Sequence, residues 1–220
     1  MKGTMNSAAI DACFRHTKGL FILLFLTLTG CALPNQAARP VVYDFGPGLL
    51  TTAPTHEELQ LPALALDLVE TNPALDSTAV LYRLAYADSQ QLRPYGQARW
   101  SMTPAQLLRQ RLRQHFSLRR ALLNPGDISN PGAPSPVLLR IELEEFSQLF
   151  EAPDQSIGLL RLRATLTQPG PQGEKWLAQR NLMLQRGAPT ADAPGGVRAL
   201  TAATDAALQE LDLWLQALGR

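Results

Sequence analysis

The sequence has little of what marks several large protein classes. It contains only two cysteines, Cys13 and Cys31, and only three histidines among 220 residues. Its charges nearly balance, with a formal net charge of +1 at pH 7, which gives no indication of a nucleic-acid partner. The most apolar run, Leu20–Leu28, is roughly nine residues long, far short of the about 20 that a permanent membrane-spanning helix needs.

Signatures of catalysis and of metal binding are also missing. There is no G-x-S-x-G nucleophile motif and no phosphate-binding loop. His56 lies in an expected loop, and His115 lies at the edge of an arginine-rich helix. Neither histidine has a cysteine, histidine or carboxylate at the spacing of metal ligands. The sequence therefore predicts no catalytic residue, no metal site and no cofactor.

Three glutamates, Glu142, Glu144 and Glu145, are the best remaining candidates for general acids or metal ligands. They lie opposite Arg161 and Arg163 if the two segments form a hairpin. Cross-strand ion pairs on a solvated face then explain them without any chemistry.

The N-terminus has the pattern of a bacterial lipoprotein signal. Lys2, Arg15 and Lys18 outnumber Asp11 before the apolar run, which is typical of a signal peptide. The run ends at Leu28-Thr29-Gly30-Cys31, which resembles the lipobox in which small residues precede the modified cysteine. We predict that residues 1–30 are removed and that Cys31 is lipidated. A stray cysteine behind an ordinary signal peptide is the alternative, and either Met1 or Met5 is the start.

Several consequences follow for the mature chain. Cys13 leaves with the signal peptide, so no second thiol remains for a disulfide. Loss of the signal changes the formal net charge from +1 to −1, because three basic residues and one acidic residue are removed. Ala32, rather than Asp, resembles lipoproteins that are passed on to the outer membrane. We expect a protein held there by its acyl chains, facing the periplasm.

Residues 31–40 are predicted to form a lipidated tether, and residues 41–220 a single domain. Alternating or β-branched runs predict strands. They are expected at 41–46, 64–69, 79–86, 91–94, 137–146, 160–167 and 176–186.

Two helices are predicted. Thr103, Pro104 and Gln106 form a capping box with proline at the first helical position, and an apolar stripe runs on to Phe116. A second helix spans about 194–218, and its stripe of leucines with Trp214 is expected to pack on the core rather than to bind a partner.

These elements predict an α+β fold, with a mainly antiparallel sheet of about six or seven strands and two main helices packed on one face. The hairpin of the strands near 141 and 164 also has a predicted register. Ile141 and Leu143 have odd numbers, and Leu162 and Ala164 have even numbers. If all four side chains share one buried face, residues that pair across the two strands must have numbers whose sum is odd, and 305, 307 and 309 are the candidate sums.

The first helix and the turn after it are strongly basic. They could meet anionic lipid or an acidic partner, but a solvated polar face is favoured. The basic residues are Arg109, Arg111, Arg113, Arg119 and Arg120.

A family resemblance covers nearly the whole mature chain. Its central signature comprises Val80-Leu81-Tyr82-Arg83, Leu92, Tyr95, Arg99-Trp100, Pro104, Leu107-Leu108, Leu112 and Phe116. This resembles the ABC-type transport auxiliary lipoprotein family, which also begins with a lipidated cysteine and an early Tyr-x-aliphatic strand, here Tyr43-Asp44-Phe45. Phe45 in place of the usual leucine, and the Pro/Gly-rich loop at 124–136, depart from the pattern.

The resemblance implies a non-enzymatic role beside an MCE-domain protein and an ABC permease and ATPase that move lipids or other hydrophobic compounds. The transporter must supply the energy, because this chain has no ATPase motif. Self-association is left open. The alternatives are an outer-membrane scaffold in envelope assembly without a transporter and, less favoured, a lipid-anchored hydrolase.

Overall fold

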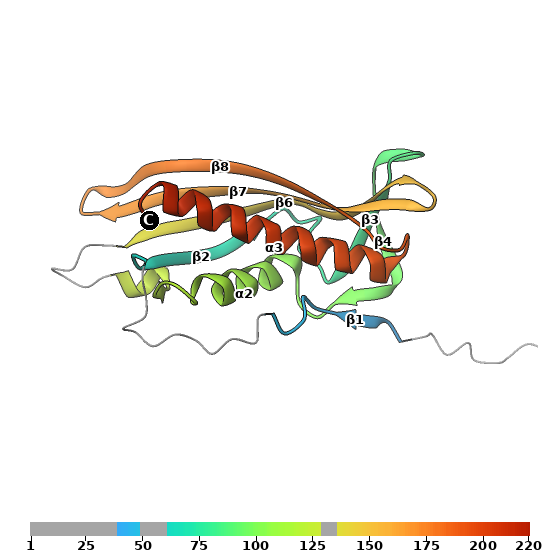
Figure 1. Cartoon of the computed structure of the whole chain (residues 1–220), viewed down its shortest axis with the longest axis horizontal. Helices are drawn as coiled ribbons and strands as arrows, with labels where there is room; N and C mark the ends of the chain where they lie inside the picture. The colour runs from blue at the N-terminus through green and yellow to red at the C-terminus, as the bar shows by residue number, and fades with distance from the viewer. Residues whose placement is uncertain (1–38, 49–60, 129–135) are drawn as a thin grey trace, which may run out of the picture. The chain divides into compact units, whose positions relative to one another are not determined.

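Eight strands form one mixed sheet in the computed structural model, which describes residues 39–48, 61–128 and 136–220 (Figure 1). The strands are β1 (Val41–Tyr43), β2 (Leu64–Thr71), β3 (Ala79–Leu84), β4 (Asp88–Trp100), β5 (Leu122–Leu123), β6 (Val137–Ala152), β7 (Gln155–Gly170) and β8 (Gly173–Gly187). The helices are α2 (Pro104–Phe116) and α3 (Ala193–Ala217), with the 3-10 turn η3 (Pro125–Ile128). Residues 39–220 group into one compact unit.

The strand directions correct the sequence-based expectation. Four of the seven strand pairings are parallel: β1 with β4, β2 with β5, β2 with β6, and β3 with β6. The prediction of a mainly antiparallel sheet with six or seven strands was therefore wrong, while the α+β class holds. Parallel neighbours need a long crossover. The segment between β4 and β6, which contains α2, supplies that crossover.

Strand β6 organises the sheet. Its first half pairs with β2, its second half pairs with β3, and its other edge pairs along its length with β7. Strands β6, β7 and β8 form the predicted antiparallel meander, but they are longer than expected at 16, 16 and 15 residues.

The predicted hairpin register is confirmed at its first candidate value. Glu142 pairs with Arg163 and Leu143 with Leu162, so the sum is 305. A β-bulge then inserts Glu144, and Glu145 becomes the register partner of Arg161. The extra residue shifts the alternation of side chains by one position, which brings Phe146 into the core at 2% exposure.

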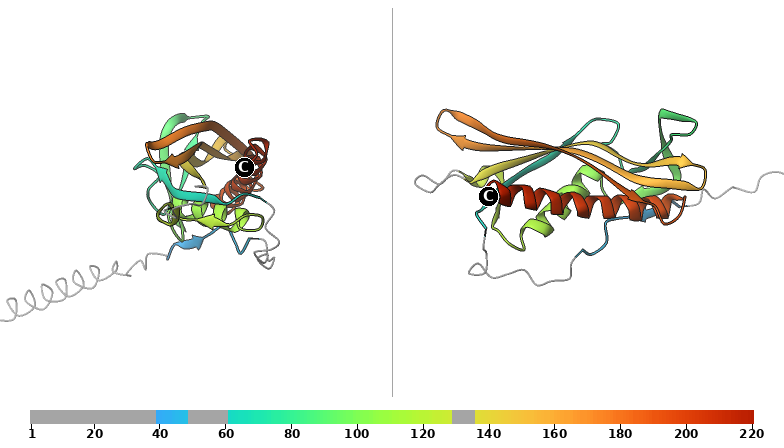
Figure 2. Two further views of the ribbon diagram at one scale, coloured as in Figure 1. Left: turned by 90° about the vertical axis from the view of Figure 1, so that its left-hand side faces the viewer. Right: turned by 45° about the horizontal axis from the view of Figure 1, so that its top comes forward.

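Both helices lie on the same side of the curved sheet (Figure 2). Helix α3 packs along β7 and β8, and α2 packs against β2. Ile141, Leu143, Leu162 and Ala164 are buried in one core with the apolar faces of both helices. Gly158 permits this close packing, because a Cβ atom there would lie 2.6 Å from the backbone of Ala199 and Leu200.

The helix starts follow their sequence signals. In α2, the Thr103 side chain accepts from the Gln106 N–H while the Gln106 side chain accepts from the Thr103 N–H, which confirms the capping box. In α3, the Asp192 carboxylate accepts from the Gly195 N–H at 2.8 Å. Hydrogen bonds from Thr190 and from this N–H lower the pKa of Asp192 and keep it ionised as a cap.

An aromatic cluster fixes the segment after β1 to the sheet. The ring of Phe45 lies 5.6 Å from that of Trp100 and 6.0 Å from that of Phe146.

Among the described residues, no helix is long and apolar enough to cross a membrane.

Candidate interaction surfaces and a polar pocket

The predicted modification site cannot be located in the structure. Cys31 and His56 both lie outside the described residues, so lipidation of Cys31 stays a prediction. No group of three or more His, Cys, Asp or Glu side chains suited to a metal ion occurs in the described ranges.

The glutamate candidates all engage in ion pairs. Glu142 contacts Arg163 at 3.1 Å, and Glu144 contacts both Arg161 at 3.0 Å and Arg163 at 2.6 Å. These residues occupy the outer face of the sheet, which we define as the face opposite the two helices. The interpretation of Glu142 and Glu144 as partners in cross-strand pairs is confirmed.

Glu145 has a different partner from the one expected. Its carboxylate contacts Arg83 of β3 at 3.0 Å rather than an arginine of β7. The bulge at Glu144 separates the two adjacent glutamates, so that one serves each neighbouring strand. Further along the outer face, Arg140 binds Asp67 and Glu174, and the hydrogen bond from Arg140 lowers the pKa of Glu174.

Three of the five basic residues that were expected to form a solvated face contact helix α3 instead. Arg111 makes a two-point contact with Asp205 of α3 at 2.8 and 3.0 Å. Arg119 and Arg120, just after α2, both contact Asp212 of α3 at 3.2 Å. Most of the positive charge that the sequence assigns to this region is thus used to join the two helices.

Arg120 is the most unusual of these residues, because its side chain is only 1% exposed. Its guanidinium lies 5.5 Å from the ring centroid of Phe116, a cation–π contact. Its Nε and Nη1 atoms are buried and have no hydrogen-bond partner. The carboxylate of Asp212 is therefore the main group that compensates for the buried positive charge of Arg120.

His115 lies in the same helix junction, where its ring meets Phe116 edge to face at 5.4 Å. Burial lowers its pKa below the ordinary value of 6.5, although Asp212 and Asp205 act in the opposite direction. His115 does not belong to any group of three or more His, Cys, Asp or Glu side chains suited to a metal ion among the described residues.

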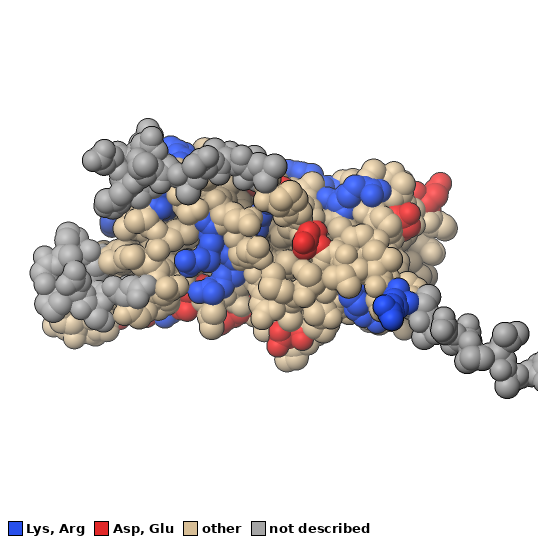
Figure 3. All heavy atoms as spheres, turned by 90° about the horizontal axis from the view of Figure 1, so that it is seen from below, with Lys and Arg blue, Asp and Glu red and all other residues tan. Residues whose placement is uncertain are grey.

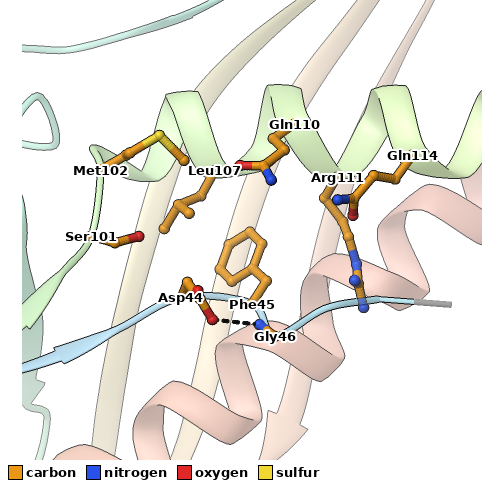
Figure 4. A pocket seen from close by; sticks show the side chains of 9 residues that line it. All are labelled: Asp44, Phe45, Gly46, Ser101, Met102, Leu107, Gln110, Arg111 and Gln114. Atoms are coloured by element: carbon orange, nitrogen blue, oxygen red, sulfur yellow. Dashed lines mark hydrogen bonds between the residues drawn. The ribbon is translucent and has the colours of Figure 1, made fainter. Parts of the chain in front are cut away.

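A small polar pocket opens between the segment after β1 and α2 (Figure 4). Its volume is about 180 Å³, below the usual range for sites that hold drug-sized ligands. The Arg111 side chain that borders it is already bound to Asp205. The lining residues are Asp44, Phe45, Gly46, Ser101, Met102, Leu107, Gln110, Arg111 and Gln114.

Sequence reasoning missed a buried polar chain near the start of α3. The Tyr95 hydroxyl donates to Gln148 Oε1 at 2.7 Å, and Gln148 Nε2 donates to Ser156 Oγ at 2.7 Å. Burial raises the pKa of Tyr95. Gly196 of α3 packs on Gln148, where a Cβ atom would come within 2.1 Å of Oε1. The signal available in the sequence was a glutamine among the apolar residues Phe146, Leu149 and Phe150, because a glutamine in such a run needs hydrogen-bond partners if it is buried.

The exposed edge formed by β8 was also not predicted from the sequence. Strand β8 pairs only with β7 among the described strands. Trp176 and Met183 are 61% and 64% exposed along it.

The packing face of α3 was predicted correctly. Leu208, Leu211 and Leu215 are buried, and Trp214 is packed against the core.

Comparison with solved structures supports the fold. Protein XCC0632 from Xanthomonas campestris is 18% identical and superimposes with a TM-score of 0.62, over 79% of this chain and 94% of that one. A second structure, titled an uncharacterized protein, is 13% identical with a TM-score of 0.57, over 80% and 99% of the two chains. At these identities the likeness concerns the fold alone. No curated protein matches the chain.

The fold and its surfaces define an α+β domain whose described ionisable clusters form ion pairs rather than a catalytic constellation. Residues 43–211 match the family described as the ABC-type transport auxiliary lipoprotein component, and the chain belongs to that family. Its class is thus an auxiliary lipoprotein of ABC-type transport, and no catalytic family is indicated.

Proposed function

We propose that this protein is a lipid-anchored, non-enzymatic component that couples an MCE-associated ABC transporter for lipids or other hydrophobic compounds to the outer membrane. The observation that carries the proposal is the family match over residues 43–211, which begins 12 residues after the lipobox-like cysteine. Cys31 holds the domain on the periplasmic side of the outer membrane. An MCE-domain protein and a permease with its ATPase are the partners.

The geometry supports a role in contact rather than in chemistry or storage. The acidic candidates on the outer face are bound to arginines. The polar pocket of about 180 Å³ is too small and too polar for a two-chain lipid, since sites for much smaller ligands already occupy about 300 to 1,000 Å³. We infer that the cargo travels through the partner and that this chain positions the partner.

The first test concerns the anchor. Cys31→Ala should abolish incorporation of labelled fatty acid and release the protein from the membrane fraction, because the acyl chains supply the membrane affinity. Cys13→Ala is the matched control, since it removes the other cysteine and should leave labelling intact. Labelled fatty acid on the Cys31→Ala protein would contradict the proposal.

The second part of the test concerns the transporter. Deletion of this gene and deletion of the gene for the ATPase partner should give the same loss of envelope lipid homeostasis, with no added effect in the double deletion. Additive phenotypes would instead support the second candidate, an outer-membrane scaffold without a transporter. The neighbouring genes give a faster check, because a transporter auxiliary should lie beside a permease, an ATPase and an MCE-domain gene.

A further inference from the structure

Strand β8 is the long free edge of the sheet. It pairs with β7 along its length and with no other described strand, and in Figure 1 it runs along the margin of the sheet. It has 15 residues and no proline. The strands at the other margins, β1 and β5, have only three and two residues. An open edge of this length is a template for pairing with another strand.

The direction of the backbone groups in β8 follows from one hydrogen bond beyond its end. The Ala188 N–H donates to the Ser156 carbonyl at 2.9 Å, which continues the β7–β8 register by one pair. Bonded and non-bonded pairs alternate in an antiparallel ladder, so the even-numbered residues in this part of β8 bond to β7. Three residues between them therefore point their N–H and C=O groups away from the sheet: Asn181, Met183 and Gln185.

A second hydrogen bond agrees with this direction. The Gln185 carbonyl accepts from Nη1 of Arg186 at 2.8 Å. A side chain thus occupies the place on this carbonyl that a neighbouring strand would take.

The charges of β8 leave a positive excess. Arg186 and Lys175 are exposed and contact no described carboxylate. Glu174, the acidic residue of the strand, is bound to Arg140. Figure 3 shows the side of the molecule away from β8, where basic and acidic side chains both appear, and three arginines in the region of α2 are bound to aspartates of α3. The edge of β8 therefore suits a strand that carries an acidic residue.

The side chains of β8 define what the added strand must carry. Met183 is the register partner of Arg161, so it lies on the outer face of the sheet, where it is exposed. Leu182 and Leu184 are buried on the helix side, and alternation places Arg186 on the same side as Leu184. An added strand would need apolar side chains beside the two leucines and beside Met183, and an acid beside Arg186.

We propose that β8 accepts an extended segment of a partner protein as an additional antiparallel strand, with an acidic residue opposite Arg186. Main-chain hydrogen bonds to the open residues supply affinity, and the alternating side chains supply specificity. The acid replaces the Gln185 carbonyl as the partner of the guanidinium. A second copy of β8 would bring more positive charge and no free acid. The inference deepens the proposed function and rests on it only in that the bound partner is a protein.

A designed peptide tests the edge without the natural partner. The probe is fluorescein-labelled Ser-Glu-Thr-Val-Tyr-Val-Thr-Ser. Antiparallel pairing places its glutamate opposite Arg186 and its tyrosine opposite Met183. Its two valines lie opposite Leu184 and Leu182. We expect a saturable rise in fluorescence anisotropy with the complete mature chain carrying Cys31→Ser. Because neither an acyl chain nor a transporter is present, failure of the proposed function would leave this result unchanged, whereas absence of binding would overturn the inference.

Backbone methylation of the peptide separates strand pairing from adhesion of side chains. An N-methyl group on the tyrosine removes the N–H that donates to the Met183 carbonyl, so the affinity should fall about tenfold. The same group on the valine opposite Leu184 points away from β8 and should leave the affinity close to that of the parent peptide. Equal losses for the two methylated peptides would overturn the proposal.

A charge exchange locates the acidic residue. Arg186→Glu replaces a favourable cross-strand pair by a like-charged one and should weaken binding about fivefold. A peptide with lysine in place of its glutamate should restore the affinity for this variant. Lys175→Gln is the matched control, because it removes a positive charge from β8 outside the paired segment and should not change binding. Absence of recovery with the lysine peptide would overturn the assigned pairing.

Amide hydrogen exchange measures the edge residue by residue. In the free protein, the amides of Asn181, Met183 and Gln185 should exchange faster than those of Leu182 and Leu184, because only the latter two bond to β7. The peptide should slow the first three. Slow exchange of all five in the free protein would overturn the proposal, and a dimer in sedimentation would then identify a second copy as the occupant. Unchanged exchange with the peptide bound would place the peptide elsewhere and overturn it as well.

Discussion

Ion pairs on the outer face of the sheet and ion pairs between α2 and α3 use the same residue types in different surroundings. On the outer face, the side chains of Arg163 and Glu142 are 40% and 50% exposed. At the helix junction, those of Arg120 and Asp212 are 1% and 13% exposed. Water screens the first pair and hardly reaches the second. The comparison teaches that equal distances do not give equal energies, because burial sets the cost of losing a partner.

The largest expected effect comes from the helix junction. Asp212→Ala should lower the free energy of unfolding by about 3 to 5 kcal/mol, because it leaves the buried Arg120 without a counter-charge. Chemical denaturation followed by circular dichroism measures this loss.

A double variant sharpens the result. Arg120→Met combined with Asp212→Leu should recover most of the stability lost in Asp212→Ala, because no charge then remains buried. If the double variant is as unstable as the single one, packing of Asp212 rather than charge compensation explains the junction.

The next effect is a pH dependence of stability that arises at His115. Burial lowers the pKa of His115 in the folded protein below the 6.5 of the unfolded chain, so the unfolded state binds more protons. Stability is then complete above pH 6.5 and decreases as the pH falls toward the folded pKa. Unfolding measured across this range should show the decrease, and His115→Gln should remove that part of it. A His115→Gln protein with the same pH profile as the wild type would assign the dependence to other groups.

The smallest effect is expected on the outer face of the sheet. Glu142→Gln should change the free energy of unfolding by only about 0.2 to 1 kcal/mol, because its pair with Arg163 is exposed. Thermal or chemical unfolding at low and high salt measures it, and the difference from wild type should shrink as salt is added. A loss as large as that of Asp212→Ala would break the distinction between the two regions.

Local features of the fold were predictable from the sequence, whereas long-range ones were not. The capping box of α2 and the hairpin register near Glu142 depend on residues close together in the chain. Spacing was sufficient to predict the cap, and parity narrowed the register to three candidates that included the observed one. The parallel placement of β2 and β3 beside β6 depends on how crossovers are laid over the sheet. Alternation of side chains is the same in parallel and antiparallel strands, so it carries no information about direction.

The surfaces show the same limit. Glu142 and Glu144 were correctly interpreted because their partners lie one hairpin away, whereas the partner of Glu145 was missed because Arg83 lies 62 positions away. The arginines of α2 were not correctly interpreted, because Arg111 and its partner Asp205 are 94 positions apart. A basic helix and a helix with two aspartates on one side each look solvated when considered alone.

The bulge at Glu144 also matters for anyone comparing this chain with distant relatives. Because it adds one residue to β6 but none to β7, a relative without it would need a single-position gap at this point in any alignment. A gap placed elsewhere would assign Phe146 and the rest of β6 to the wrong face, and every inference about buried or surface positions beyond it would be inverted. In a designed variant, deletion of Glu144 would have the same consequence in the protein itself: the second half of β6 would have to slide against β3 and β7 or present its aromatic residues to water.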